Sequence, residues 1–401
     1  MSAPGIGPFA SERDVAHASS ASAAEGASTI FATLLETVRH HVDGQLAMWL
    51  GPKVVAASHV SADVHAAAEA VERLALRGGK RMRAALVVAG YDACGGQGRG
   101  EGTSPTGEEH VRALLRSVDR AAVAIELLQV YLLVHDDWMD DDDVRRGGPT
   151  VHVTLRKRLG SKHLGDSAAV LAGDLACAYA QEALLEVPLA AERVLGAARA
   201  FAQIQEDVVI GQLAEMSAAH PRMAAPDRAG PAASQVPVEL IHALKTASYT
   251  VTGPLALGAY LAGASDARVA QLAQYGRPLG IAFQLRDDLL GVFGDPTVTG
   301  KPVGNDIRQG KRTALIAELR GDARCAPVLA RVLGNANAEV ADLAELVRAM
   351  ETSGARARVE ARVAELLAEA RAALAAMALP DASPGRVWLA GAVRALGERT
   401  A

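Results

Sequence analysis

This chain has few cysteines and few aromatic residues, and its basic residues do not outnumber its acidic ones. Its 401 residues include three cysteines and 3% aromatics, and 41 Lys and Arg stand against 46 Asp and Glu. The net charge of −5 gives no overall basic field, so we expect no nucleic-acid partner. The cysteines are odd in number and far apart, which excludes a disulfide framework or zinc knuckle and suits a reducing cytoplasm. A hydrophobic content of 50% with few aromatics predicts an all-α protein with a core of Ala, Leu and Val.

No segment of the sequence has the features that predict a targeting signal, and none is predicted to span a membrane. Residues 1–28 are rich in Ala, Ser and Gly, carry acidic residues and contain no apolar run, so we predict a disordered tail. The longest uncharged stretch, residues 246–265, is diluted by hydroxyl side chains, Pro254 and glycines, and is expected to be a buried helix. We therefore expect a cytoplasmic protein with one all-helical domain over residues 29–401 and no transmembrane segment.

Helical periodicity recurs through most of the chain after Ile30. Apolar residues return at steps of three and four between Val111 and Ile125, for example. No strand alternation competes with this pattern. Residues 95–107 and 220–237 are rich in Gly, Pro, Asp and Ser, so they are predicted to be surface loops between helices.

A first acidic cluster follows directly on an apolar helical run. Six of the eight residues from Asp136 to Asp143 are aspartates. Asp136 and Asp140 lie one helical turn apart, where like charges cost about 0.2–0.5 kcal/mol per pair, and a helix C-terminus disfavours negative charge. A solvated acidic loop is the ordinary alternative, but it fits poorly beside so apolar a helix. Hard oxygens at this spacing suit Mg²⁺, which completes its coordination with water and substrate phosphates.

A second acidic pair, Asp287 and Asp288, ends another apolar helix, which we expect to begin near Val269. Two helices that deliver Asp pairs to one end of a bundle can hold several divalent ions between them. The repetition therefore predicts a site for a diphosphate.

Cations for such a diphosphate occur in short clusters. Glycines let the backbone approach an anion, and Arg binds phosphate oxygens in bidentate fashion. Any single cluster is weak evidence, because a glycine-basic run is often a capped helix and a Lys-Thr pair is usually on the surface. The clusters comprise Lys80, Arg81 and Arg83, then Arg145 and Arg146, then Lys245, and finally Lys301, Lys311 and Arg312.

These motifs together resemble the trans-isoprenyl diphosphate synthases, whose short-chain members make farnesyl and geranylgeranyl diphosphate. The resemblance spans roughly residues 67–313 and implies a single large helical bundle around a central cavity, the isoprenoid synthase type, assembled as a homodimer. Its marks are GGKRMR at 78–83, HDDWMD and VRRGGPTVH within 135–152, KT at 245–246, FQLRDD at 283–288, and GKPVGNDIRQGKRT ending at 313.

The resemblance implies metal ligands at both acidic helix ends. Asp136 and Asp140 would bind Mg²⁺ with Asp137 in support, while Asp287 would bind a further ion with Asp288 in its outer shell. Three Mg²⁺ ions are expected, with Mn²⁺ as a substitute.

It also implies the substrates and the residues that contact them. The reaction would join isopentenyl diphosphate head to tail with an allylic diphosphate, namely dimethylallyl, geranyl or farnesyl diphosphate. Thr246 and Gln284 would lie beside the reacting carbons. Arg145, Lys245, Lys301 and Lys311 would contact the allylic diphosphate, and Lys80, Arg83, Gln129 and Arg146 would hold isopentenyl diphosphate.

Product length is expected to depend on Tyr131 and Leu132, five and four residues before Asp136. In the family, a bulky residue at the fifth position without a second aromatic beside it resembles the geranylgeranyl (C20) type. Farnesyl diphosphate (C15) is the competing product.

Three rival interpretations remain at this point. Gly291 stands where many family members carry a third Asp, which leaves open a non-catalytic regulatory subunit of the same fold. A class I terpene cyclase also uses an Asp-rich helix, but the basic residues for a second diphosphate would then be superfluous. A purely structural Ala-rich bundle would leave the paired aspartates without a role.

Overall fold

The structure is a computed structural model, and it describes residues 12–98, 108–219, 236–294 and 304–397. These residues are almost entirely helical, as the composition predicts. The first part of the chain forms α1 (Glu12–Ser58), α2 (Ala62–Leu76), α3 (Met82–Ala93), α4 (Glu108–Met139), β1 (Val144–Arg145), β2 (Gly148–Pro149), α5 (Val151–Leu159), α6 (Lys162–Leu185) and α7 (Ala191–Ala219). The second part forms α8 (Val238–His242), the π-helix η3 (Ala243–Thr252), α9 (Gly253–Ala262), α10 (Asp266–Phe293), α12 (Asn305–Arg308), α13 (Ala314–Arg320), the 3₁₀-helix η4 (Ala323–Cys325), α14 (Ala326–Val332), α15 (Val340–Thr352), α16 (Ala355–Ala376) and α17 (Pro384–Gly397).

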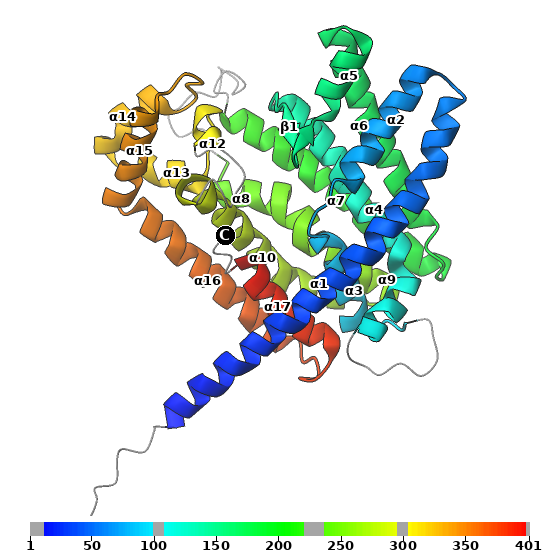
Figure 1. Cartoon of the computed structure of the whole chain (residues 1–401). Helices are drawn as coiled ribbons and strands as arrows, with labels where there is room; N and C mark the ends of the chain where they lie inside the picture. The colour runs from blue at the N-terminus through cyan, green and yellow to red at the C-terminus, as the bar shows by residue number, and fades with distance from the viewer. Residues whose placement is uncertain (1–11, 99–107, 220–235, 295–303, 398–401) are drawn as a thin grey trace, which may run out of the picture.

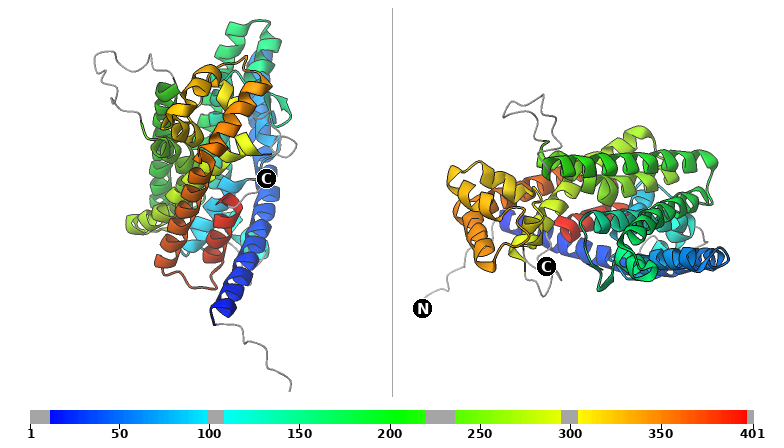
Figure 2. Two further views of the ribbon diagram at one scale, coloured as in Figure 1. Left: turned by 90° about the vertical axis from the view of Figure 1, so that its left-hand side faces the viewer. Right: turned by 90° about the horizontal axis from the view of Figure 1, so that it is seen from above.

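The long helices form an elongated bundle, and the short helices α12 to α15 lie together at one end of it (Figures 1 and 2). Helix α4 packs against α1, α3 and α6, while α10 packs against η3, α9 and α16. The two helices that carry the acidic clusters, α4 and α10, are thus both central members of the bundle. The predicted all-α fold is confirmed.

Close helix packing explains how this core forms with few aromatic residues. At the crossing of α3 and α9, a Cβ on Gly90 would lie 2.5 Å from the carbonyl oxygen of Leu255, and one on Gly258 would lie 2.5 Å from the nitrogen of Tyr91. The two backbones can approach this closely only because glycine has no side chain. Aliphatic residues fill most of the remaining core, with Tyr91 and Tyr275 as the largest fully buried side chains.

A two-stranded hairpin is the only β-structure within the described ranges. Strand β1 pairs antiparallel with β2, and the two residues of the turn, Arg146 and Gly147, have φ of 50° and 72°. Positive φ at both positions is the requirement of a type I′ turn, which matches the twist of the strands. The turn projects Arg146 from the chain just after the first acidic cluster.

Part of the tail predicted for residues 1–28 is helical in the structure. Helix α1 begins at Glu12, and residues 1–11 lie outside the described residues. Residues 12–28 are rich in Ala, a strong helix former, and they continue a helix whose later turns are fixed by packing from Phe31 onward. The beginning of α1 projects beyond the rest of the bundle (Figures 1 and 2).

One described helix, α6, is long and apolar enough to cross a membrane by length and composition, and 39% of its apolar window is buried. The uncharged stretch singled out in the sequence, residues 246–265, instead forms η3 and α9, most of whose residues are buried as predicted. All three cysteines are free.

Candidate active site

One face of α4 carries the first acidic cluster into a cleft. Gln129, Leu132, Asp136 and Asp140 follow one another at steps of three and four residues, so they form one stripe along the helix. Asp136 and Asp140 are partly exposed, whereas Asp137 points away from this stripe and is 1% exposed. Asp136 and Asp140 therefore face the cleft, whereas Asp137 faces the protein interior.

Two lysines from distant segments neutralise the cleft-facing aspartates. Lys245 Nζ, on η3, lies 3.5 Å from Asp136 Oδ1, and Lys311 Nζ donates to Asp140 Oδ2 at 2.7 Å. Burial lowers the pKa of each lysine, but the neighbouring carboxylates outweigh it and the pKa of both is raised. Both side chains are therefore ammonium cations at neutral pH.

Asp137 is bound to Arg145 of the hairpin. Arg145 Nε donates to Asp137 Oδ1 at 2.7 Å, and its Nη2 makes a second ion pair with the same oxygen. Burial raises the pKa of Asp137 to about 6, although Arg145 opposes the shift. We conclude that this pair fixes the hairpin to the end of α4.

The second acidic pair lies within α10, which begins at Asp266 and continues past the pair to Phe293, so the prediction that Asp287 and Asp288 end this helix is wrong. The pair still has one Asp outward and one inward. Asp287 is exposed, and Asp288 is 6% exposed and accepts a hydrogen bond from Gln284 Nε2 at 2.9 Å. Burial raises the pKa of Asp288 to about 7, while Gln284 lowers it. His242 Nε2 lies 3.6 Å from Asp288 Oδ2, and burial lowers the pKa of His242 to about 4, so this histidine is neutral.

A short chain of contacts links the first acidic cluster to the segment of α10 that carries the second acidic pair. Lys245 contacts Asp136, and the next residue, Thr246, donates through Oγ1 to Gln284 Oε1 at 2.8 Å, one turn before Asp287. On the other side, Lys311 contacts Asp140 and lies 3.9 Å from Asp306.

The π-helical form of η3 places its side chains in this cleft. Lys245 and Thr246 lie one turn before Tyr249 and Thr250, and π-helical turns occur frequently at functional sites. A Cβ on Gly211 of α7 would lie 2.5 Å from the nitrogen of Lys245. The glycine thus allows α7 to support η3 directly behind Lys245.

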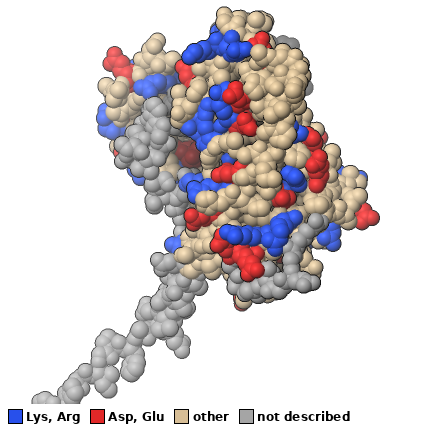
Figure 3. Space-filling model, turned by 45° about the vertical axis from the view of Figure 1, so that its right-hand side comes forward, with Lys and Arg blue, Asp and Glu red and all other residues tan. Residues whose placement is uncertain are grey.

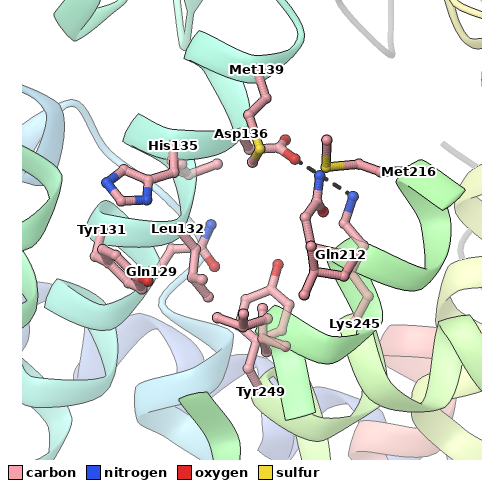
Figure 4. A pocket seen from close by; sticks show the side chains of 14 residues that line it. Gln129, Tyr131, Leu132, His135, Asp136, Met139, Gln212, Met216, Lys245 and Tyr249 are labelled. Atoms are coloured by element: carbon pink, nitrogen blue, oxygen red, sulfur yellow. Dashed lines mark ion pairs between the residues drawn. The ribbon is translucent and has the colours of Figure 1, made fainter. Parts of the chain in front are cut away.

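An apolar cavity of about 270 Å³ opens beside Asp136 and Lys245. Figure 4 shows the acidic and basic side chains at one side of it and Tyr131, Leu132 and Tyr249 further in. Its wall comes from α4, α7 and η3 and also includes Gln129, Leu133, His135, Met139, Val208, Val209, Gln212, Leu213 and Met216. Such a cavity suits a hydrocarbon chain whose charged end remains at the mouth.

A second cavity, of about 240 Å³, is lined by cations. Lys80, Arg83 and Arg146 all contribute to it. Arg83 Nη2 donates to Thr250 Oγ1 at 2.9 Å, and its guanidinium lies 4.3 Å from the ring of Tyr249, which lines the apolar cavity. The two cavities are therefore separated by the Arg83–Tyr249 contact. Figure 3 shows basic and acidic side chains close together on one face of the molecule.

The sequence profile of the polyprenyl synthetase family matches residues 64–350. The chain belongs to the polyprenyl synthetase family. This membership confirms the predicted enzyme class, a prenyltransferase. The matched residues include both acidic clusters and the whole lining of the apolar cavity.

Individual members of the polyprenyl synthetase family align over most of the chain. A geranylgeranyl diphosphate synthase of Saccharolobus solfataricus is 33% identical over 70% of this chain and 76% of its own length. A (2E,6E)-farnesyl diphosphate synthase of Mycobacterium tuberculosis is 32% identical over 76% of this chain and 75% of its own. The crystal structure of a Corynebacterium glutamicum geranylgeranyl pyrophosphate synthase, complexed with isoprenyl diphosphate and magnesium, superposes with a TM-score of 0.75 at 32% identity, covering 92% of this chain and 99% of the other.

Arg81 and Gln129 are two further basic or polar residues of the motifs. Arg81, within GGKRMR, is 2% exposed and is bound to Glu126 at 3.0 Å and Asp43 at 2.7 Å, so it is structural. Gln129 lines the apolar cavity and is not among the residues of the basic cavity. Lys301 lies outside the described residues.

The sequence analysis missed three side chains of the site. Glu215 of α7 accepts a hydrogen bond from Lys245, and Gln212, one turn earlier, lines the apolar cavity. Asp306 Oδ2 would lie 3.4 Å from a Cβ on Gly291. Asp306 thus brings a carboxylate close to the position where the motif lacks its third Asp.

The donor set of this polyprenyl synthetase fits a divalent ion that completes its coordination with substrate. Within the described ranges, no three His, Cys, Asp or Glu side chains form a ready metal cluster. Asp136 and Asp140 instead supply carboxylate oxygens from one helix face, with mobile ammonium groups as counterions. Mg²⁺ commonly uses one or two carboxylates and takes its other oxygens from water and phosphates.

Proposed function

We propose that this polyprenyl synthetase condenses isopentenyl diphosphate head to tail with an allylic diphosphate, in a magnesium-dependent reaction whose main product is geranylgeranyl diphosphate. One observation carries the proposal. Asp136 lines an apolar cavity beside Lys245, and a cation-lined cavity adjoins it at the contact between Arg83 and Tyr249.

The acidic side of the cleft would bind the allylic diphosphate through metal ions. Asp136, Asp140 and Asp287 are the residues that would hold them, three Mg²⁺ in the expected arrangement, with Mn²⁺ as a substitute. Bound there, the ions supply Lewis-acid stabilisation of the charge that develops on the leaving diphosphate. Lys245 and Lys311 would exchange their carboxylate partners for phosphate oxygens and neutralise the same charge.

The basic cavity would bind the diphosphate of isopentenyl diphosphate. Lys80, Arg83 and Arg146 line it, and burial together with neighbouring Arg81 lowers the pKa of Arg146. This group of cations favours a ligand with several negative charges. The acceptor double bond would then lie beside Thr246 and Gln284, which are hydrogen-bonded to each other.

Loss of the allylic diphosphate leaves a carbocation that water would quench. The apolar wall, which includes Leu132 and the buried Val208, would keep water away from the chain that carries this cation. The double bond of isopentenyl diphosphate attacks the cation, and the proton lost afterwards passes to the departed diphosphate.

Tyr131 and Leu132 would limit the growing chain, because both line the apolar cavity. We propose C20 as the product on this basis. Farnesyl diphosphate is the alternative, supported by the relative of that name. The length of the product made from dimethylallyl, geranyl or farnesyl diphosphate distinguishes the two.

We also propose a homodimer formed through α6 and α7. Leucines at positions 164, 171 and 185 of α6 recur at multiples of seven residues and are 54%, 67% and 64% exposed. Leu195 and Leu213 of the adjacent α7 are 54% and 55% exposed. Aligned exposed leucines on neighbouring helices are typical of a protein interface. Sedimentation of the wild type against Leu171→Glu tests this, with a monomer expected only for the variant.

The domain assignment stays a proposal. Residues 29–401 would fold as one unit, which is supported by the packing of α1 against α17 and by a core that runs from Phe31 to Leu396. We propose a cytoplasmic location for this unit.

Diphosphate release and product analysis with and without isopentenyl diphosphate test the function. A synthase gives a longer prenyl diphosphate only when both substrates and Mg²⁺ are present. Hydrocarbon formation without isopentenyl diphosphate would indicate a terpene cyclase. The absence of any product, with folded protein, would indicate a regulatory subunit.

A further inference from the structure

The wall of the apolar cavity includes two rings from neighbouring turns of α4. Tyr131 and His135 are one turn apart, and their ring centroids lie 4.7 Å from each other with the planes at 63°. This edge-to-face arrangement is a favourable aromatic geometry. Tyr131 begins about 7.5 Å along the helix from Asp136, at a rise of about 1.5 Å per residue, so it lies away from the charged mouth.

His135 is in turn held by α6. Its Nε2 donates to the carbonyl oxygen of Val170 at 3.1 Å and lies 3.6 Å from Asp174 Oδ1. This bond places the proton on Nε2 and fixes the plane of the imidazole. The ring that faces Tyr131 is therefore fixed from a second helix and not from α4 alone.

Gly173 makes this contact sterically feasible. A Cβ on Gly173 would lie 2.5 Å from His135 Cδ2 and closer still to Nε2. Real Cβ atoms do not approach other heavy atoms this closely, so any larger residue would displace the imidazole. Gly173 lies in the interior of α6, where glycine costs about 0.5–1 kcal/mol relative to alanine, so its presence requires a packing reason.

We propose that His135 is a positioning residue for product length: anchored on α6 at Gly173 and Val170, it holds the ring of Tyr131 across the prenyl cavity. This inference deepens the proposed function and rests on it. It places part of the length control on α6, a helix that supplies none of the cavity residues given above.

The arrangement predicts opposite effects for two substitutions. His135→Ala removes the contact that holds Tyr131, so the phenol can rotate aside and longer products form. Gly173→Ala pushes the imidazole away from α6 and towards the cavity that it lines, so shorter products form. A change of one methyl or methylene in an apolar pocket typically alters discrimination about tenfold or more, and we expect product ratios to shift by about tenfold.

The experiment measures the ratio of product lengths from farnesyl and geranyl diphosphate with isopentenyl diphosphate and Mg²⁺. It compares the wild type with His135→Ala, Gly173→Ala, Tyr131→Ala and the double variant of His135 and Tyr131. His135→Gln is a second variant, because its amide can still donate to Val170 while it offers no ring to Tyr131. We expect His135→Gln to lengthen the products as His135→Ala does.

The double variant separates positioning from direct contact. If His135 acts through Tyr131, adding His135→Ala to Tyr131→Ala changes the product ratio no further. Gly196→Ala on α7 is the matched steric control, because its Cβ would lie 3.2 Å from Tyr260, away from the cavity. We expect it to leave the ratio unchanged.

Three results would overturn the inference. They are unchanged product ratios in folded Gly173→Ala and His135→Gln enzymes, additive effects in the double variant, or shifts of the same size in Gly196→Ala. Each of these requires an active wild type, so they differ from failure of the proposed function, which would appear as no condensation by the wild type.

Discussion

At the end of α4, cations from three other segments lie against the aspartates, whereas at the end of α10 the buried aspartate meets neutral side chains. Arg145, Lys245 and Lys311 contact the first cluster. Asp288 contacts Gln284 and neutral His242. Similar sequence patterns therefore serve different tasks. The aspartates at the first end are neutralised by cations, whereas the charge of the buried carboxyl at the second end is poorly compensated.

The largest expected effect is on activity, and it distinguishes Asp136 from the neighbouring Asp137. Asp136→Asn removes a cleft-facing carboxylate and should lower kcat by about 10³-fold, because Asp136 is the proposed ligand of a metal ion that would stabilise the leaving group. Its stability should stay close to that of the wild type, since Asp136 is partly exposed. Steady-state kinetics and thermal unfolding check both parts. Activity within tenfold of the wild type would contradict the assignment.

Asp137→Ala should affect stability instead. It leaves Arg145 partly buried beside the hairpin without its main partner, and breaking such a pair costs about 3 kcal/mol. Urea unfolding of the metal-free protein measures this loss. An unchanged urea midpoint would show that the ion pair between Arg145 and Asp137 does not hold the hairpin in place.

The second acidic pair should make the free energy of unfolding depend on pH. The pKa of Asp288 is raised to about 7 by burial, from an ordinary value of 3.8, so the folded state holds this proton more tightly than the unfolded state. The protonated carboxyl therefore contributes stability below about pH 4, and this contribution is lost as the pH rises to about 7. Asp288→Asn should remove the loss and stabilise the metal-free protein at pH 8 by on the order of 2 kcal/mol, but not at pH 4. Equal effects at the two pH values would contradict this account.

The smallest expected effect concerns the missing third Asp. Gly291→Ala meets only Asp306 Oδ2, at 3.4 Å, so it should keep activity within about twofold and gain about 0.5 kcal/mol from helix propensity. Gly280→Ala on the same helix is the matched contrast, since its Cβ would lie 2.6 Å from Ala247 Cα behind η3. It should lower both activity and stability. Similar behaviour of the two variants would contradict the packing described for α10.

The sequence predicted the features that local patterns determine. Apolar periodicity identified the helices, and the change from apolar residues to aspartates located the end of α4 near Asp136, whereas α10 continues past Asp287 to Phe293. The motif resemblance then identified Lys245 and Lys311 as cations of the same site. These contacts join segments far apart in the chain, so spacing alone would not have paired them.

Other features depend on packing between segments that are far apart in the chain, which the spacing of residues in the sequence does not predict. Glu215 and Gln212 are single polar residues on a long helix, and only the close approach at Gly211 directs them to Lys245 and the cavity. Arg145 resembles a free phosphate ligand in sequence but is engaged by Asp137. The start of α1 was misplaced because an Ala-rich segment has both the composition of a tail and the propensity of a helix.

Calorimetric binding of a non-reactive allylic diphosphate analogue in the presence of Mg²⁺ tests the central claim, that both acidic helix ends serve one ligand. The measurement compares the wild type with Asp136→Asn, Asp287→Asn and the double variant. We predict that each single variant binds the analogue at least about tenfold more weakly than the wild type. The binding free energy lost in the double variant should be much smaller than the sum of the two single losses, because both acidic clusters act on one ligand. Wild-type affinity in Asp287→Asn, with loss confined to Asp136→Asn, would contradict the account.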